Sequence, residues 1–265
     1  MELTETLLDQ IECIAREAAG VIMAVYQRDF GVTHKADKSP LTEADSAAHG
    51  LITARLAALT PAVPILSEED TASFAGADAA GRYWLVDPLD GTREFIKRNG
   101  EFTVNIALIE RGRAVLGVVW VPVQGLAYLG ARGLGAFKQD AAGVRRPIAV
   151  AEHCSGTPWK VVGSRSHASE ATARWLSRLG CCELEAIGSS LKLCLVAEGR
   201  ADVYPRLGPT CLWDTAAAQA VVEQAGGAVI GLDGTALCYA DTEHLLNPYF
   251  VVHGRSDMHW PSLSE

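Results

Sequence analysis

The sequence predicts an α/β protein with two unlike halves, an N-terminal α+β half over residues 1–150 and a C-terminal α/β half over residues 151–265. In the first half, two β-rich runs in FTVNIALIERGRAVLGVVWVP are joined by Arg111-Gly112, a hairpin signal that predicts an antiparallel-rich sheet. In the second half, strand and helix patterns alternate, which predicts a mostly parallel or mixed sheet. No linker-like segment marks residue 150, so we expect the halves to share an interface.

The first half opens with a helical pattern and then changes to short apolar runs. Apolar residues recur at helical spacing from Leu7 to Ile22, and a polar loop, THKADKSPLTEAD, follows them. The remaining elements expected in this half are a helix over 46–59, strands over 63–66 and 83–88, the hairpin, further sheet in GLAYLGARGLGAF, and a closing run over 144–150.

The second half reads as alternating strands and helices. The expected strands lie in WKVVGS, CCELEAI, ADVYPR and NPYFVVHG, and the expected helices in EATARWLSRLG, SSLKLCLVAEG and WDTAAAQAVVEQAGG.

Composition excludes several classes of protein. The net charge of −9 argues against nucleic-acid binding through a basic surface. The seven cysteines are scattered without a C-x-x-C pair, which argues against a disulfide framework and a structural zinc site and suits a reduced, cytoplasmic protein. No signal-peptide pattern opens the chain, and no apolar run approaches the ~18 residues of a membrane span.

Acidic residues follow the apolar strands at the points where ligands gather. In WLVDPLDGTREF, Asp87 ends an apolar run, Pro88 is expected to force a turn, and Asp90 is expected to swing to the same side as Asp87. Gly91 allows close approach of the backbone to a ligand, and its amide and that of the next residue can face an anion if a helix begins there.

Two further carboxylate sources lie elsewhere in the chain. Glu68 follows the short strand in VPILSEED, and Asp214 opens an alanine-rich helix. Separated carboxylates at element ends are what Mg²⁺ needs, since it prefers oxygen ligands and takes few from protein. Two such ions about 4 Å apart could activate a water and stabilise the leaving oxygen of a phosphate ester.

Each of these residues also has a simpler interpretation. Asp214 could be a helix N-cap, Glu68 could lie in a solvated loop, and Asp87 and Asp90 could be turn formers. Asp45 could be a first-turn acid favoured by the helix dipole. The combination of the motifs favours the metal site.

The motifs LSEED, WLVDPLDGTREF and LWDTAAA together resemble the lithium-sensitive, Mg²⁺-dependent phosphatase superfamily that includes the inositol monophosphatases. Its signature, D-P-[LI]-D-G-T-x-x-F, is matched at every fixed position from Asp87 to Phe95. Further motifs resemble the CysQ-type 3′(2′),5′-bisphosphate nucleotidase branch, namely KADKSPLTEAD, GSRSH, GSSLKLCLVAEGRADVYPR and GPTCLWDTAAAQAVVEQAGG. Arg93 departs from the lysine more usual in that branch, but it keeps the positive charge. The resemblance implies a layered αβαβα sugar-phosphatase-like fold.

The resemblance also implies roles for individual residues. Glu68, Asp87, Asp90, Asp214 and the carbonyl of Leu89 would ligate two or three Mg²⁺ ions. Asp45 and Thr92 would hold and deprotonate the attacking water, and the amides around Gly91 and Thr92 would hold the scissile phosphate.

The nucleotide would be held by the second half. The residues implied there are Ser164, His167, Gly188 and Lys192, with Arg206 assisting at the second phosphate. Without the resemblance, Lys192 is better interpreted as a solvated charge on a helix, and His167 as an ordinary surface or core histidine.

The activity implied is Mg²⁺-dependent removal of the 3′-phosphate of adenosine 3′,5′-bisphosphate by an activated water, giving AMP and phosphate, a step of sulfur metabolism. Adenosine 3′-phosphate 5′-phosphosulfate stays open as a second substrate. The alternatives are an inositol monophosphatase or fructose-1,6-bisphosphatase of the same superfamily and, more remotely, a non-catalytic metal-dependent binding protein. A homodimer and peripheral contact with the inner membrane are also left open for this cytoplasmic protein.

Overall fold

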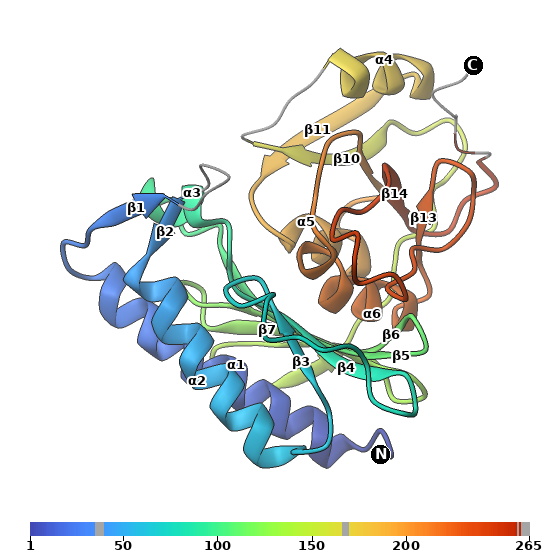
Figure 1. Ribbon diagram of the computed structural model, residues 1–265. Helices are drawn as coiled ribbons and strands as arrows, with labels where there is room; N and C mark the ends of the chain where they lie inside the picture. Colours follow the sequence, from blue (N-terminus) through green and yellow to red (C-terminus); the bar gives the residue numbers. More distant parts are fainter. Residues whose placement is uncertain (35–39, 166–169, 259, 261–265) are drawn as a thin grey trace.

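The computed structural model describes residues 1–34, 40–165, 170–258 and 260, and this part of the chain forms five alternating layers of helix and sheet (Figure 1). The helices are α1 (Glu5–Tyr26), α2 (Glu43–Leu59), α3 (Thr92–Ile96), α4 (Glu170–Leu179), α5 (Leu191–Ala197), α6 (Ala216–Gln224) and the 3-10 turn η1 (Leu212–Asp214). None of the described helices is both long and apolar enough to cross a membrane.

Two sheets carry most of the described strands. The first sheet has the spatial order β3 (Ile65–Ser67), β4 (Arg82–Asp90), β5 (Thr103–Glu110), β6 (Arg113–Val121), β7 (Leu126–Ala131), β8 (Gly135–Gln139) and β9 (Arg145–Pro147). The second has the order β11 (Cys182–Ile187), β10 (Trp159–Ser164), β12 (Val203–Arg206), β14 (Phe250–His253) and β13 (Ala228–Gly231). A small hairpin pairs β1 (Val32–His34) with β2 (Pro40–Thr42).

The expected fold class is confirmed. In the first sheet only β3 pairs in parallel with its neighbour, and the other pairs are antiparallel. The second sheet is mixed, because β10 is parallel to β11 and β12 whereas β14 is antiparallel to both of its neighbours.

The helices cover both faces of the first sheet. One apolar cluster packs α1 and α2 against one face, with Ile11, Ile52 and Trp84 among its fully buried members. A second cluster packs α5 and α6 between the two sheets, and a third packs α4 on the outer face of the second sheet (Figure 1). Because the middle cluster contains residues of both sheets, the halves share a core; the division at residue 150 stays a prediction.

Two glycines allow α6 to lie directly on the first sheet. A Cβ on Gly117 would lie 2.0 Å from the carbonyl oxygen of Ala217, and one on Gly130 would lie 2.6 Å from the Cα of Val221. Such distances are inside van der Waals contact, so only glycine permits this approach. The close packing brings Asp214, in the η1 turn just before α6, up to the strands of the first sheet.

The structure corrects several expectations about individual elements. Pro88 does not force a turn: β4 continues to Asp90, with a bulge between Asp87 and Asp90. The loop expected over 33–45 contains β1 and β2 in its described part, and α2 begins at Glu43 rather than residue 46 because Thr42 and Asp45 form a capping box. Strand β13 was not predicted, because its four residues follow two glycines without a longer apolar run.

Candidate active site

The bulge in β4 makes Asp87 and Asp90 face the same side. In the pairing with β5, Asp87 lies opposite Asn105 and Asp90 lies opposite Thr103. Strand β4 therefore has one more residue than β5 between these two pairs. Side chains three positions apart point to opposite faces of a regular strand, and one inserted residue reverses that relation. Pro88 fits at this point because a bulge does not require its missing amide hydrogen.

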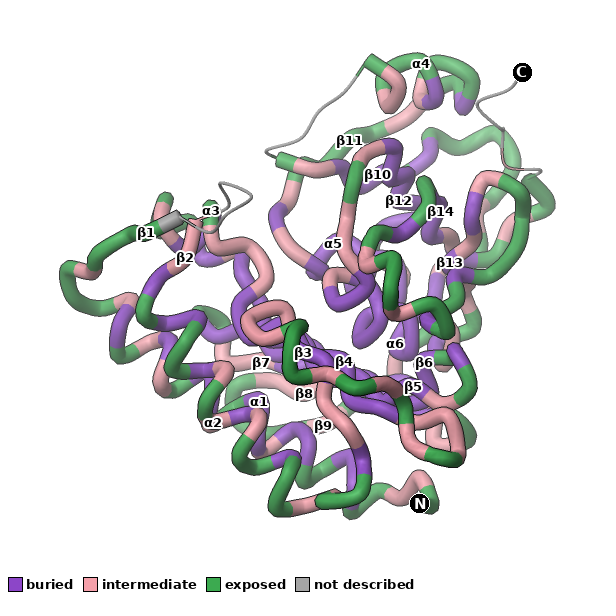
Figure 2. The backbone as a smooth tube through the Cα atoms, viewed as in Figure 1, coloured by how far each residue is buried: buried purple, intermediate pink, exposed green. Residues whose placement is uncertain are grey.

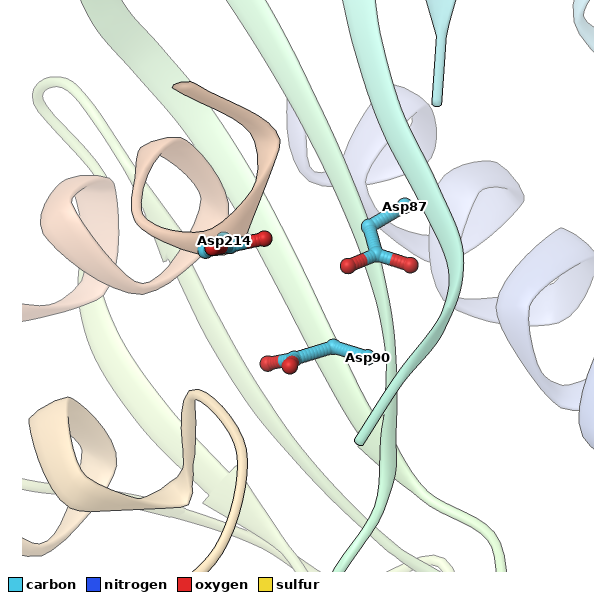
Figure 3. Close-up of side chains that lie close together, drawn as sticks. All are labelled: Asp87, Asp90 and Asp214. Atoms are coloured by element: carbon cyan, nitrogen blue, oxygen red, sulfur yellow. The ribbon is translucent and has the colours of Figure 1, made fainter. Parts of the chain in front are cut away.

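Asp214 completes an acidic cluster with these two residues. Carboxylate oxygens of Asp87, Asp90 and Asp214 lie within 4.8 Å of one another, and Figure 3 shows the three side chains converging from β4 and from the η1 turn that precedes α6. Asp214 is held because its Oδ2 accepts a 2.9 Å hydrogen bond from the amide of Cys211. It therefore closes the η1 turn, rather than serving as the N-cap of α6.

Burial and like charge make the three carboxyl groups hard to ionise. Burial, with the charges of Glu68, Asp90 and Asp214, raises the pKa of Asp87 well above its usual range. Burial raises the pKa of Asp90 as well, although Lys192 opposes this shift. Burial and the Asp90 charge raise the pKa of Asp214 to about 8. Carboxylates crowded in this way are stabilised in the charged form by a cation placed between them.

The segment after the cluster begins a short helix, which is the condition under which the amides of Gly91 and Thr92 can face an anion. Gly91 has a φ of +93° and is the N-cap of α3, which starts at Thr92. A Cβ at Gly91 would lie 3.1 Å from the carbonyl oxygen of Glu101, so this position favours glycine on two counts.

Asp45 and Thr92 are brought together from distant parts of the chain. The Thr92 hydroxyl donates to Asp45 Oδ1 over 3.2 Å. The other oxygen of Asp45 accepts from the amide of Thr42 at 2.8 Å and from its hydroxyl at 2.6 Å. The two interpretations of Asp45 are therefore compatible, since one oxygen caps α2 and the other contacts Thr92.

A cavity of about 260 Å³ opens next to the acidic cluster. It is lined by residues from both halves, among them predicted site residues Glu68, Asp87, Leu89, Asp90, Gly91, Thr92, Ser164, Gly188, Lys192, Arg206 and Asp214. Asp45 lies behind Thr92 and does not line the cavity in the described part of the chain. His167 lies outside the described residues.

Two buried cations, Lys192 and Arg206, also line the cavity. Lys192 is 7 % exposed, and its Nζ donates to the carbonyl of Ser189 at 2.5 Å. Burial lowers the pKa of Lys192 to about 8, against the opposing effect of Asp90. The interpretation of Lys192 as a solvated helix charge is therefore wrong.

Arg206 is the second of these cations. It is 9 % exposed, and its Nη2 donates to the carbonyl of Pro209 at 2.6 Å. Its Nε is buried and has no hydrogen-bond partner among the described residues. A buried donor without a partner is costly, and an anionic ligand in the cavity would offer it one.

The sequence analysis missed the residues that hold Asp90 in place. Asp90 Oδ2 accepts from the amide of Ser190 at 2.6 Å and from Asn105 Nδ2 at 3.3 Å. The Ser190 hydroxyl in turn donates to Asn105 Oδ1 at 2.8 Å. One signal was available for Asn105, because an amide in the middle of the apolar run FTVNIALIE needs a polar partner once it is buried.

Comparison with known proteins assigns the class. The model of the inositol monophosphatase family matches residues 3–258, so the chain belongs to the inositol monophosphatase family. The 3′(2′),5′-bisphosphate nucleotidase CysQ of Escherichia coli K12 is 51 % identical over 248 residues, covering 93 % of this chain and 99 % of that protein.

Solved structures agree with this placement. CysQ from Bacteroides thetaiotaomicron, a bacterial member of the same family, superposes with a TM-score of 0.81 at 38 % identity and covers 96 % of this chain and 98 % of its own. An inositol monophosphatase from Zymomonas mobilis gives a TM-score of 0.80 at 25 % identity, covering 100 % and 98 % of the two chains. CysQ proteins are thus among the relatives that this chain is similar to in both comparisons.

Proposed function

We propose that this protein is a Mg²⁺-dependent 3′(2′),5′-bisphosphate nucleotidase that converts adenosine 3′,5′-bisphosphate to AMP and phosphate. One observation carries the proposal: a carboxylate cluster and two buried cations line the same cavity. A substrate with two phosphates needs both sets of groups, the metal ligands at the phosphate that is cleaved and the cations at the phosphate that stays. The similarity to CysQ nucleotidases over 93 % of the chain supports the same substrate class.

The donor set of the cluster suits Mg²⁺. It offers carboxylate oxygens without cysteine or histidine among the clustered residues, and hard divalent cations prefer such ligands. Asp87, Asp90 and Asp214 would hold the ions, with Glu68 and the carbonyl oxygen of Leu89 completing the set. When bound, Mg²⁺ supplies Lewis-acid stabilisation of the phosphoryl oxygens and lowers the pKa of a coordinated water.

Asp45 and Thr92 would direct the proton of the attacking water. Because the Thr92 hydroxyl donates to Asp45, its oxygen lone pairs are left to accept a hydrogen bond from a water in the cavity. Thr42 fixes the opposite oxygen of Asp45, so the pair is oriented before substrate arrives. A water aligned in this way can be deprotonated as it attacks the 3′-phosphorus in line with the departing ribose oxygen.

The two buried cations would select the bisphosphate. Lys192 and Arg206 are held by backbone carbonyls at fixed positions, and they would bind the phosphate that is not cleaved. An inositol monophosphate carries no second phosphate for these two cations, which is why we favour the nucleotide.

Phosphate release tests the proposal directly. The substrates are adenosine 3′,5′-bisphosphate, inositol 1-phosphate and fructose 1,6-bisphosphate, each with Mg²⁺ and with chelator. We expect a strong, chelator-sensitive preference for the bisphosphate nucleotide. A preference for inositol or sugar phosphate would support the metal site but overturn the role proposed for Lys192 and Arg206. No phosphate release from any of the three substrates would favour a non-catalytic binding protein.

A further inference from the structure

Glu101, in the loop between α3 and β5, holds two segments of the C-terminal half at once. Its carboxylate forms a bidentate pair with Arg165, from Nε to Oε2 at 2.8 Å and from Nη2 to Oε1 at 2.6 Å. The same Oε2 accepts the backbone amide of Gly188 at 2.8 Å. One side chain therefore ties the first half of the molecule to the end of β10 and to the turn between β11 and α5.

Both tied segments carry or adjoin residues expected to hold the nucleotide. Arg165 directly follows Ser164, which lines the cavity, and Gly188 lines it as well. Arg165 also donates to the carbonyl of Ala186 at 2.6 Å, which joins the two segments to each other. Neither Glu101 nor Arg165 lines the cavity in the described part of the chain, so any effect of the pair on substrate passes through its neighbours.

The turn after Gly188 has little freedom to adapt. A Cβ at Gly188 would lie 2.7 Å from the Glu101 carbonyl oxygen and 2.7 Å from Cγ of Glu94. Ser189 has a φ of +49°, a conformation that disfavours side chains and persists only where the surroundings impose it. Beyond it, the amide of Ser190 donates to Asp90 at 2.6 Å. The backbone of this turn thus donates hydrogen bonds to two carboxylates of the first half, that of Asp90 in the metal cluster and that of Glu101.

We propose that Glu101 is a positioning residue that sets affinity for the nucleotide part of the substrate, by fixing Ser164 and Gly188 relative to the metal cluster. This inference rests on the proposed function. The bond from Ser190 to Asp90 does not involve Glu101, so we expect the metal cluster to keep its geometry when Glu101 is changed. Loss of the Glu101 pair should therefore raise KM for the bisphosphate nucleotide and leave the chemical step nearly unchanged.

The first test compares Glu101→Gln with a matched control, Glu110→Gln. The Glu110 side chain pairs with Arg132 at 2.6 Å, and its exposure of 28 %, against 17 % for Glu101, makes the two pairs comparable. We expect Glu101→Gln to raise KM for adenosine 3′,5′-bisphosphate about tenfold, the scale of one charge-assisted hydrogen bond. We expect kcat and the inhibition constant of inorganic phosphate, which has no nucleoside part for Ser164 and Gly188 to hold, to change less than about twofold. Glu110→Gln should change none of the three.

A double variant and an exchange measurement separate positioning from general damage. Arg165→Gln breaks the same pair from a more exposed side chain, and Glu101→Gln/Arg165→Gln should raise KM no more than the larger single effect. Amide exchange over residues 186–190 should be faster in Glu101→Gln than in the wild type or in Glu110→Gln.

Each unfavourable result has a distinct meaning. An unchanged KM, or a parallel loss of kcat and of phosphate affinity, would overturn the positioning role while the wild type still cleaves the nucleotide. If the wild type releases no phosphate from that nucleotide, the proposed function fails and the substrate part of this inference fails with it. If amide exchange over residues 186–190 is also unchanged in Glu101→Gln, Glu101 does not hold this turn in place.

Discussion

Strand β4 and the turn that follows β11 both contribute residues to the cavity, but the two strands lie in very different surroundings. Strand β4 is buried from Tyr83 to Leu89 under helices on both faces, whereas β11 is an edge strand whose residues from Glu183 to Ala186 are exposed (Figure 2). The carboxylates proposed to bind metal come mainly from the buried strand β4. Gly188, which is expected to hold the nucleotide, lies in the turn after the exposed strand β11, and hydrogen bonds to Asp90 and Glu101 of the first half hold this turn. We therefore expect changes near β4 to affect kcat, and changes near the β11 turn to affect KM.

The largest effect should come from Asp90→Asn. Loss of one clustered carboxylate removes a preorganised electrostatic contact, so kcat should fall by about 10²-fold or more. Phosphate release and circular dichroism check this, with a folded but inactive variant expected. Either an active variant or an unfolded one would contradict the metal-ligand role.

Thr92→Val should also lower kcat by about 10²-fold, the lower range for a lost proton-transfer group. Valine keeps the shape of threonine but leaves Asp45 without its hydroxyl partner. Thr92→Ser is the matched control and should keep most activity. Equal activity of the valine and serine variants would exclude the hydroxyl from the proton path.

Lys192→Met should weaken binding of the bisphosphate substrate. Loss of the buried cation should raise KM for the bisphosphate about tenfold or more, the scale of a charge-assisted contact. Stability should not fall, because an apolar side chain of similar volume avoids the cost of burying a charge. Steady-state kinetics and thermal unfolding check both points, with exposed Lys160→Met as the control. A lower kcat at unchanged KM would move Lys192 to the metal end.

The smallest effect concerns pH and stability without metal. Because burial raises the pKa of Asp214 to about 8, the folded metal-free protein keeps a proton that the unfolded chain has lost above pH ~4. Its free energy of unfolding should therefore fall as pH rises between those values. Denaturant unfolding at pH 5 and 8 in chelator measures the slope, and Asp214→Asn should flatten it. Saturating Mg²⁺ should flatten it as well, and a slope that Asp214→Asn leaves intact would place the proton elsewhere.

Sequence reasoning worked best where one local motif carries several groups. Asp87, Asp90, Gly91 and Thr92 lie within six positions, so their common location followed from their spacing. The way in which they meet did not follow, because a bulge replaces the expected turn at Pro88. Whether a chain bulges or turns at a proline depends on whether a neighbouring strand continues to pair with it, and β5 does so.

Three features could be predicted from the sequence alone: the acidic motif from Asp87 to Thr92, the order of most helices and strands, and the mixed α/β character of the chain. These features depend on residue type and short-range periodicity, which are local properties. Three other features depend on tertiary packing. Lys192 is buried, and the two carboxylate oxygens of Asp45 accept hydrogen bonds from Thr42 and Thr92. The carboxylate of Glu101 accepts a hydrogen bond from the amide of Gly188, 87 residues away. Burial and long-range hydrogen bonds arise from the packing of whole layers, and no local pattern encodes which distant groups that packing brings together.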